Sequence, residues 1–83
     1  MTQHTLKLRE EYYHAVKHGL KTWEFRLDDR GFKVGDQLKL NLYTEHGVNQ
    51  EEYVRAVITY ILTHEDFEMI PEGWVIMSIR RVD

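Results

Sequence analysis

The sequence predicts a mainly β fold with one helix (α+β), a small five-stranded barrel in the order β-α-β-β-β-β. Several short stretches alternate between apolar and polar residues, which is the pattern of half-buried strands. One stretch begins with acidic residues and ends with basic ones, as helices do. The 83 residues suffice for a single domain, 1–83, and barrel closure would remove exposed strand edges. An opened-out α+β sandwich is the alternative.

The first strand is expected over residues 5–9, where leucines alternate with polar residues. A helix is expected over 10–18, because Glu10 and Glu11 suit its first turn and Gly19 suits a left-handed cap after its end. This helix would pack across the sheet. Its apolar stripe is expected to include Tyr12 and Val16, and the further candidate members are Tyr13 and Leu20.

The second strand is expected over 22–28, where the alternation is strict. The odd-numbered residues Trp23, Phe25 and Leu27 would lie on one face and build the core. The opposite face presents polar side chains and could recognise a ligand; its residues are Thr22, Glu24, Arg26 and Asp28.

The remaining elements are separated by turn signals. Phe32 is expected to anchor the connection that leads to a tight turn at 34–36, where Gly35 supplies a positive φ. The nearly continuous apolar run 74–79 predicts a strand that is buried on both sides. The elements between these two points are a third strand over 37–43, a polar hairpin loop over 44–50, a fourth strand over 52–62, and a loop or single helical turn over 63–73.

The composition excludes several kinds of site. The chain has no cysteine, so it has neither a disulfide framework nor a thiolate nucleophile, and it suits a reducing compartment. Its first residues lack the pattern of a signal peptide, and no apolar run approaches the roughly 20 residues of a membrane span. We therefore expect a soluble cytoplasmic protein that does not interact with membranes.

The charge is distributed unevenly along the chain. Residues 1–40 carry eight cations and six carboxylates, a balance of +2, whereas residues 41–83 carry three cations and eight acids, a balance of −5. The two halves give the formal net charge of −3. A basic region in an acidic chain is compatible with binding to a nucleic acid, but the acidic half disfavours tight, non-specific binding to long duplexes.

The spacing Gly19-x-Lys21-x-x-Glu24-x-Arg26 follows the first strand and helix, and it continues into Asp29-Arg30 and Phe32-x-Val34-Gly35-Asp36. Over essentially the whole chain this arrangement resembles the ASCH branch of the PUA-like superfamily, named after a domain of the activating signal cointegrator. The similarity is strongest to a compact prokaryotic and phage subgroup. The resemblance implies a PUA-like β-barrel with a cleft beside the motif strand, and a role related to transcription or translation.

The resemblance also implies what that cleft could hold, namely RNA or a modified nucleobase. One small ASCH group hydrolyses N4-acetylcytidine through a lysine, a threonine and a glutamate. The lysine of that group corresponds to Lys21, and its threonine corresponds to Glu24, which is a departure from the pattern. Thr22 supplies a hydroxyl two residues away, and no single acid here matches the later glutamate.

We therefore predict a module that binds RNA or a modified nucleotide without a cofactor. Glu24 would accept hydrogen bonds from a base edge, and the cations would contact phosphate. The expected site residues are Lys21, Thr22, Glu24 and Arg26, with Arg30 and Lys33 on the rim. The alternatives are an amidohydrolase acting on an N4-acylated cytidine, with Lys21, Thr22 and Glu24 as catalytic residues, and a protein-interaction module.

Each of these features also has an interpretation as a purely structural one. Glu24 and Arg26 could form a salt bridge on a solvated face, where it would contribute little to stability. His14 and His18 have a spacing that can bind a metal, but no third ligand fits a zinc pattern, so no metal site is predicted. Core packing is favoured over base stacking for Trp23 and Trp74. The tyrosines expected near the edge of the cleft are Tyr12, Tyr13, Tyr43 and Tyr53, and Arg80 and Arg81 form either a solvated tail or its far wall.

Overall fold

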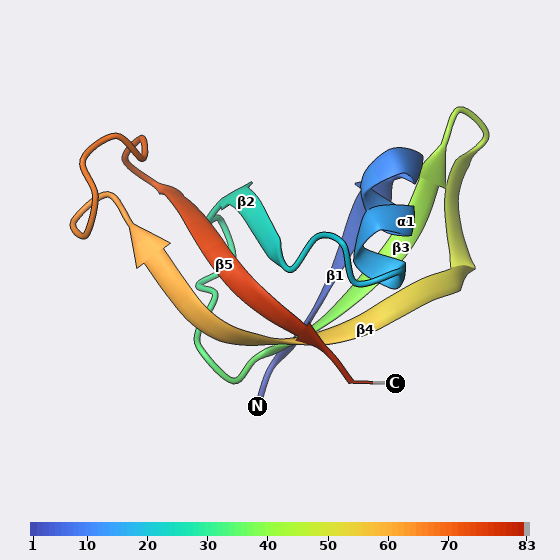
Figure 1. The fold of residues 1–83 in the computed structure, drawn as a ribbon, viewed down its shortest axis with the longest axis horizontal. Helices are drawn as coiled ribbons and strands as arrows, with labels where there is room; N and C mark the ends of the chain where they lie inside the picture. Colours follow the sequence, from blue (N-terminus) through green and yellow to red (C-terminus); the bar gives the residue numbers. More distant parts are fainter. Residues whose placement is uncertain (83) are drawn as a thin grey trace.

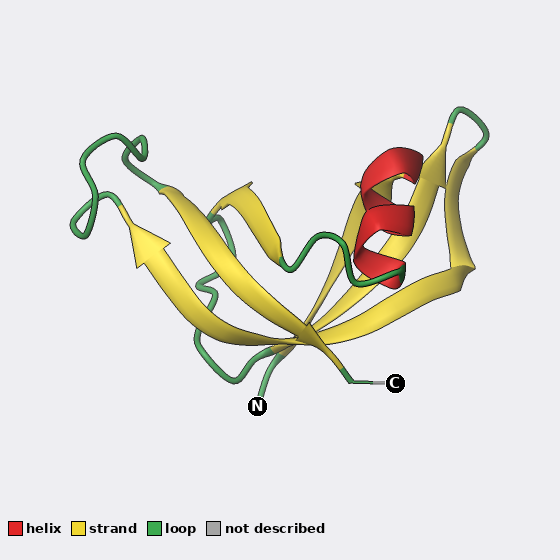
Figure 2. Cartoon of the chain, viewed as in Figure 1, coloured by secondary structure: helices red, strands yellow, loops and turns green. Residues whose placement is uncertain are grey.

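The structure is a computed structural model that describes residues 1–82, and it consists of one curled sheet with a short helix (Figure 1, Figure 2). The predicted order of elements, β-α-β-β-β-β, is confirmed. The elements are β1 (Gln3–Arg9), α1 (Glu10–Lys17), β2 (Trp23–Leu27), β3 (Gln37–Thr44), β4 (Gly47–Thr63) and β5 (Trp74–Arg81).

The sheet has the strand order β1-β3-β4-β5-β2, so β1 and β2 are its two edge strands. β1 pairs with β3 in parallel, and every other pairing is antiparallel. β4 has 17 residues and curves across the whole molecule, with α1 and β2 on its concave side (Figure 1). Its register shifts where it meets β3 at Asn41/Leu42 and β5 at Ile58/Tyr60, and such bulges bend a strand. The sheet therefore curls into a half-barrel.

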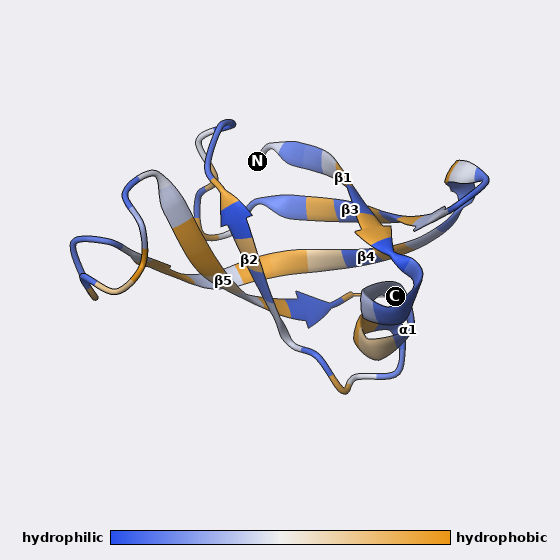
Figure 3. Cartoon of the chain, turned by 90° about the horizontal axis from the view of Figure 1, so that it is seen from above, coloured by the Kyte–Doolittle hydropathy of each residue, from blue (hydrophilic) through white to orange (hydrophobic). Residues whose placement is uncertain are grey.

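The core lies in the concavity of this sheet. Tyr13 and Val16 are the buried residues of α1, which packs against β3, β1 and β4. Apolar segments of β3, β4 and β5 are visible in Figure 3. The strand and loop residues that complete the core are Leu6, Leu8, Phe32, Leu38, Leu40, Val54, Ala56, Ile58, Val75, Met77 and Ile79. Phe32 therefore anchors the connection after β2, as predicted.

The two edge strands are joined by arginine side chains instead of a backbone ladder. Arg26 Nη2 donates to the carbonyl of Lys7 at 2.7 Å, and Arg30 Nη1 donates to the carbonyl of Thr5 at 2.7 Å. Both carbonyls belong to β1, and both would be unpaired on this edge of an open sheet. The half-barrel therefore has a seam between β1 and β2, which two arginine side chains bridge.

The orientation predicted for β2 is wrong. Trp23, Phe25 and Leu27, which were expected in the core, are about half exposed at 50%, 45% and 48%. Glu24, which was expected on the open polar face, is only 3% exposed. β2 pairs only with β5, and its even-numbered face turns into the concavity, where Arg26 reaches β1. The other strands and α1 complete the core without the aromatic residues of β2.

Smaller differences concern the other elements. β4 begins at Gly47 instead of residue 52, because polar residues that were expected in a loop pair with β3. β5 is not buried on both sides: Val75, Met77 and Ile79 face the core, and Ser78 is exposed. In α1 the buried positions are Tyr13 and Val16, whereas Tyr12 and Leu20 are exposed. No helix among residues 1–82 is long and apolar enough to cross a membrane.

A buried polar contact fastens β1 to the turn before β3. His4 Nε2 donates to Asp36 Oδ2 at 2.9 Å, and the backbone N–H of Lys33 donates to the same oxygen at 3.1 Å. These hydrogen bonds, chiefly the one from His4, lower the pKa of Asp36 below its ordinary value of 3.8 although burial acts in the opposite direction. A second carboxyl, Glu52, has its pKa lowered mainly by the hydroxyl of Tyr13 and then by Lys17.

Asp36→Asn is expected to weaken the dependence of stability on pH in the acid range. Because the folded pKa of Asp36 lies below its unfolded value, its ionisation stabilises the fold above about pH 4, and this stabilisation is lost as the pH falls through the folded pKa. Thermal unfolding followed by circular dichroism between pH 7 and pH 2 measures the effect. Glu51→Gln is the control, since it removes an exposed carboxyl of β4 and retains the contributions of Asp36 and Glu52. Identical acid profiles for wild type and Asp36→Asn would contradict this assignment.

Candidate functional site

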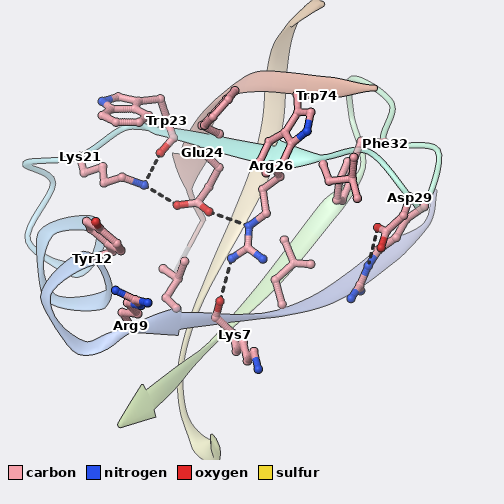
Figure 4. A pocket seen from close by; sticks show the side chains of 15 residues that line it. Lys7, Arg9, Tyr12, Lys21, Trp23, Glu24, Arg26, Asp29, Phe32 and Trp74 are labelled. Atoms are coloured by element: carbon pink, nitrogen blue, oxygen red, sulfur yellow. Dashed lines mark hydrogen bonds and ion pairs between the residues drawn. The ribbon is translucent and has the colours of Figure 1, made fainter. Parts of the chain in front are cut away.

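A cleft of about 600 Å³ opens along the seam between β1 and β2 (Figure 4). Its walls come from both edge strands, the start of α1, the connection after β2 and the first residue of β5. The residues that line it are Leu6, Lys7, Leu8, Arg9, Tyr12, Lys21, Trp23, Glu24, Phe25, Arg26, Leu27, Asp29, Arg30, Phe32 and Trp74.

Glu24 holds two cationic side chains of the cleft in place. Its carboxylate accepts from Lys21 Nζ on Oε1 at 2.5 Å and from Arg26 Nε on Oε2 at 3.0 Å, as Figure 4 shows. The side chain of Glu24 is 4% exposed, that of Lys21 13% and that of Arg26 24%. A buried carboxylate is unfavourable without partners, so two cations and one acid stabilise one another here. The predicted salt bridge between Glu24 and Arg26 exists, but it is partly buried and does not lie on a solvated face.

The two cations keep hydrogen-bonding capacity beyond Glu24. Lys21 Nζ also donates to the carbonyl of Trp23 at 2.7 Å, so one of its three N–H groups has no hydrogen-bond partner among residues 1–82. Arg26 uses one N–H for Glu24 and one for Lys7, which leaves three of its five without a partner in the same part of the chain. The cleft therefore offers fixed, charged donors to a ligand. Both oxygens of Glu24 already accept hydrogen bonds from within the protein.

The lining combines positive charge with aromatic surface. Five of its residues are cations and two are carboxylates, so the cleft carries a net charge of +3 in a chain whose net charge is −3. Lys21 Nζ lies 4.5 Å from the ring centroid of Trp23 and 5.5 Å from that of Tyr12. The rings of Phe25 and Trp74 stack with centroids 4.9 Å apart. Exposed rings next to cations form a surface on which flat, electron-rich groups can stack.

The structure brings together most of the predicted site residues. Lys21, Glu24, Arg26 and Arg30 all line the cleft. Thr22 does not, and together with Lys21 it lines a neighbouring hollow. Lys33 lines neither space, although its backbone N–H bonds to Asp36.

Sequence reasoning missed the contribution of β1 and β5 to this cleft. Lys7 and Arg9 come from β1, and Trp74 begins β5; none of them was predicted in the site as part of its wall. Their placement depends on β1 and β2 being the two edges that face each other, and no local pattern encodes this. Tyr12, which was predicted near the edge of the cleft, does line it. A signal was available in Arg9, which directly precedes α1 and ends a strand with a basic residue.

His14 of α1 and His18, which follows the helix, have the spacing of a pair of metal ligands. The rings of His14 and His18 stack with centroids 6.3 Å apart, and His14 Nε2 lies 3.9 Å from a carboxylate oxygen of Glu10. Residues 1–82 contain no group of three or more His, Asp or Glu side chains placed to hold a metal ion. The pair therefore has no third ligand within the part of the chain that is described.

The fold and the cleft define a class of protein: a small, barrel-like α+β domain with a cationic, aromatic cleft along an open seam. The chain belongs to the family described as "Domain of unknown function (DUF3850)", whose model matches residues 3–79. No curated protein matches the chain. A solved structure titled "Crystal structure of hypothetical protein PH0355" is similar, with a TM-score of 0.62 and 19% identity over 99% of this chain and 100% of that one. At this identity the likeness supports the fold alone.

Proposed function

We propose that the chain is a PUA-like domain of the ASCH type that binds RNA or a modified nucleotide in the cleft between β1 and β2. The observation that carries the proposal is the combination of a net charge of +3 with half-exposed Trp23 and Phe25 in one concave space. Single-stranded nucleic acids are bound by such combinations, because cations contact the phosphates and aromatic rings stack on the bases. The volume of about 600 Å³ is in the range of small-molecule sites and suits a nucleotide.

The roles of the residues in this proposal differ from those expected from sequence. Glu24 holds Lys21 and Arg26 in place and is not the main acceptor for a base edge, because both of its oxygens already accept hydrogen bonds. The free N–H groups of Arg26 face phosphate or the acceptor atoms of a base. Trp23 is the stacking surface, next to the ammonium group of Lys21. Cation–π contact with that ammonium group holds the indole in position.

Two other functions make different demands on the site. Hydrolysis of an N4-acylated cytidine, in which water adds to the amide carbon and cytidine and a carboxylic acid are released, was expected to use Lys21, Thr22 and Glu24. Thr22 lies outside the cleft that holds the other two, and this favours binding over hydrolysis. Incubation with N4-acetylcytidine, followed by chromatography for cytidine, tests the enzyme hypothesis. A protein-interaction module would use the exposed apolar residues of β2, and co-purification of a protein instead of RNA would favour it.

Arg30→Gln is expected to weaken RNA binding, whereas Lys33→Gln leaves it unchanged. Both residues are exposed cations three positions apart, but only Arg30 lines the cleft. One lost phosphate contact reduces the slope of log K against log salt by about 0.7 for a single strand, which is about 5-fold in affinity near 0.1 M salt. Fluorescence anisotropy with labelled, random-sequence RNA of about eight nucleotides, a length within the usual site size, measures both quantities. Equal effects of the two variants, or binding that ignores salt, would contradict the proposal.

A further inference from the structure

The sheet has a second face, which points away from α1 and the core. Along β1, β3 and β4 the residues of this outer face alternate with core residues. The segments 3–9, 37–43 and 53–57 contain no acidic residue. The residues at the centre of the outer face are Thr5, Lys7, Lys39, Asn41, Tyr43, Tyr53 and Arg55. The centre of the outer face is therefore positively charged, although the chain as a whole has a net charge of −3.

Two of these cations, Lys39 and Arg55, lie directly opposite each other in the register of β3 and β4. Like charges at opposed positions of a sheet destabilise it. Neither cation has an ion pair with a carboxylate among residues 1–82. Instead, Lys39 Nζ lies 4.6 Å and Arg55 Cζ 5.9 Å from the ring centroid of Tyr53. Lysines on edge strands can protect a sheet from aggregation, but β3 and β4 are inner strands. Fold stability therefore does not account for this pair of cations.

A buried amide oxygen without a partner lies beside them. Asn41 pairs with Lys7 on β1 and with Tyr53 on β4, and its neighbours on the same face of β3 are Lys39 and Tyr43. Asn41 is only 3% exposed, and its Oδ1 has no hydrogen-bond partner among residues 1–82. An unpartnered buried acceptor is unfavourable for folding, as is the like-charge pair. Such departures from the rules of stability are expected where a surface has a function.

The outer face and the cleft meet at β1. The carbonyl of Lys7 accepts from Arg26 in the cleft (Figure 4), whereas the ammonium group of Lys7 lies 4.6 Å from the ring centroid of Tyr43. Because β1 is an edge strand, a single strand separates the two surfaces. Lys7, Lys39 and Arg55 come from three neighbouring strands, β1, β3 and β4, so these cations lead away from the cleft across the sheet.

We infer that an RNA strand bound in the cleft continues over β1 onto the outer face, where its phosphates contact Lys7, Lys39 and Arg55. The inference rests on the proposed function and extends the ligand from one nucleotide to a single-stranded segment. Phosphates between Lys39 and Arg55 relieve the repulsion of these two cations. As the cations turn toward phosphate, Asn41 Oδ1 becomes an acceptor for a base amine or a 2′-hydroxyl group. The tyrosine rings and the continuity with the cleft favour RNA over an acidic protein segment.

The double variant Lys39→Gln/Arg55→Gln is expected to weaken binding of single-stranded RNA of about eight nucleotides by about 25-fold near 0.1 M salt. Two phosphate contacts are lost, so the slope of log K against log salt becomes shallower by about 1.4. A labelled dinucleotide is too short to reach across β1, and its binding in the cleft should be unchanged. Lys33→Gln is the control, since Lys33 is an exposed cation outside the cleft and the outer face. Fluorescence anisotropy over a range of salt concentrations measures all of these.

The outcomes separate the outer face from the cleft. If wild type binds the longer RNA and the double variant matches it, the inference is refuted and the proposed function stands. If the double variant loses binding but Arg30→Gln does not, the contacts on the outer face stand and the proposed function of the cleft fails. Labelled octaglutamate that binds as tightly as the RNA, and depends on the same two cations, would assign this face to acidic protein segments and overturn the inference.

Thermal unfolding of Arg55→Gln distinguishes a binding role from a structural one. Because the substitution removes a repulsion with Lys39, the melting temperature at low salt should stay the same or rise. Circular dichroism of wild type and Arg55→Gln measures this difference. A melting temperature clearly below that of wild type would mean that Arg55 stabilises the fold, and it would overturn the inference.

Discussion

Glu24→Ala is expected to reduce the free energy of unfolding by about 3–5 kcal/mol, because it leaves two partly buried cations without their anion. The side chain of Glu24 is 4% exposed and binds both Lys21 and Arg26, and neither cation has an ion pair with another carboxylate among residues 1–82. A domain of 83 residues has a total stability of about 4–12 kcal/mol, so this loss leaves the fold marginal. Urea unfolding followed by circular dichroism measures the change.

The matched control is Glu51→Ala, which removes an exposed glutamate from β4 that has no cation partner among residues 1–82. Its effect should stay within about 0.5 kcal/mol. The double variant Lys21→Ala/Glu24→Ala should cost less than the sum of the two single variants, since removing both charges leaves fewer of them unpaired. A loss of less than 1 kcal/mol for Glu24→Ala would mean that Glu24 does not anchor the cleft.

Trp23→Ala is expected to weaken RNA binding strongly and to change stability little. Stacking of one base on an aromatic side chain contributes about 1–3 kcal/mol, which is about 5- to 150-fold in affinity. The indole is half exposed, so its removal should cost no more than about 1 kcal/mol of folding free energy, mainly from the contact with Lys21. Anisotropy with single-stranded RNA and urea unfolding of the same preparation give the two numbers.

Tyr60→Ala is the control for RNA binding, and Leu38→Ala is the control for stability. Tyr60 is an exposed aromatic residue on β4 that lines neither space, and its loss should leave RNA binding unchanged. Leu38 is fully buried, and its loss should cost about 2–5 kcal/mol of stability. A stability loss for Trp23→Ala in the range of Leu38→Ala would restore the original interpretation of Trp23 as a core residue.

The local elements of this fold are encoded in short patterns. Alternation over 22–28 predicted β2, and the charges and glycine around 10–19 predicted α1. Period two, however, only separates two faces and does not say which of them is buried. For β2 the choice depends on its position at the edge of the sheet, where Trp23 and Phe25 are only half covered. Its apolar residues predicted that the odd-numbered face of β2 is buried. In the structure the even-numbered face is buried instead, because the ion pairs of Glu24 offset the cost of burying its carboxylate.

The candidate site was predictable only where it lies on one continuous segment. Lys21, Glu24, Arg26 and Arg30 belong to the stretch around β2, so local spacing identified them. Thr22 was misplaced because alternation groups it with Glu24, whereas it precedes the first residue of β2 and lines a neighbouring hollow. The contribution of Trp74 and of β1 arises from tertiary structure. Two strands that never pair form the seam, and their proximity follows from the curvature of the whole sheet.

The chain contains only two tryptophans, Trp23 and Trp74, and both line the cleft. Their intrinsic fluorescence therefore reports directly on the central claim, that RNA or a nucleotide occupies this space. Titration of wild type with unlabelled single-stranded RNA is predicted to quench this fluorescence in a saturable way that weakens as salt is added. Binding of labelled RNA with no change in tryptophan fluorescence would place the ligand elsewhere, and no binding at low salt would contradict a nucleic-acid function altogether.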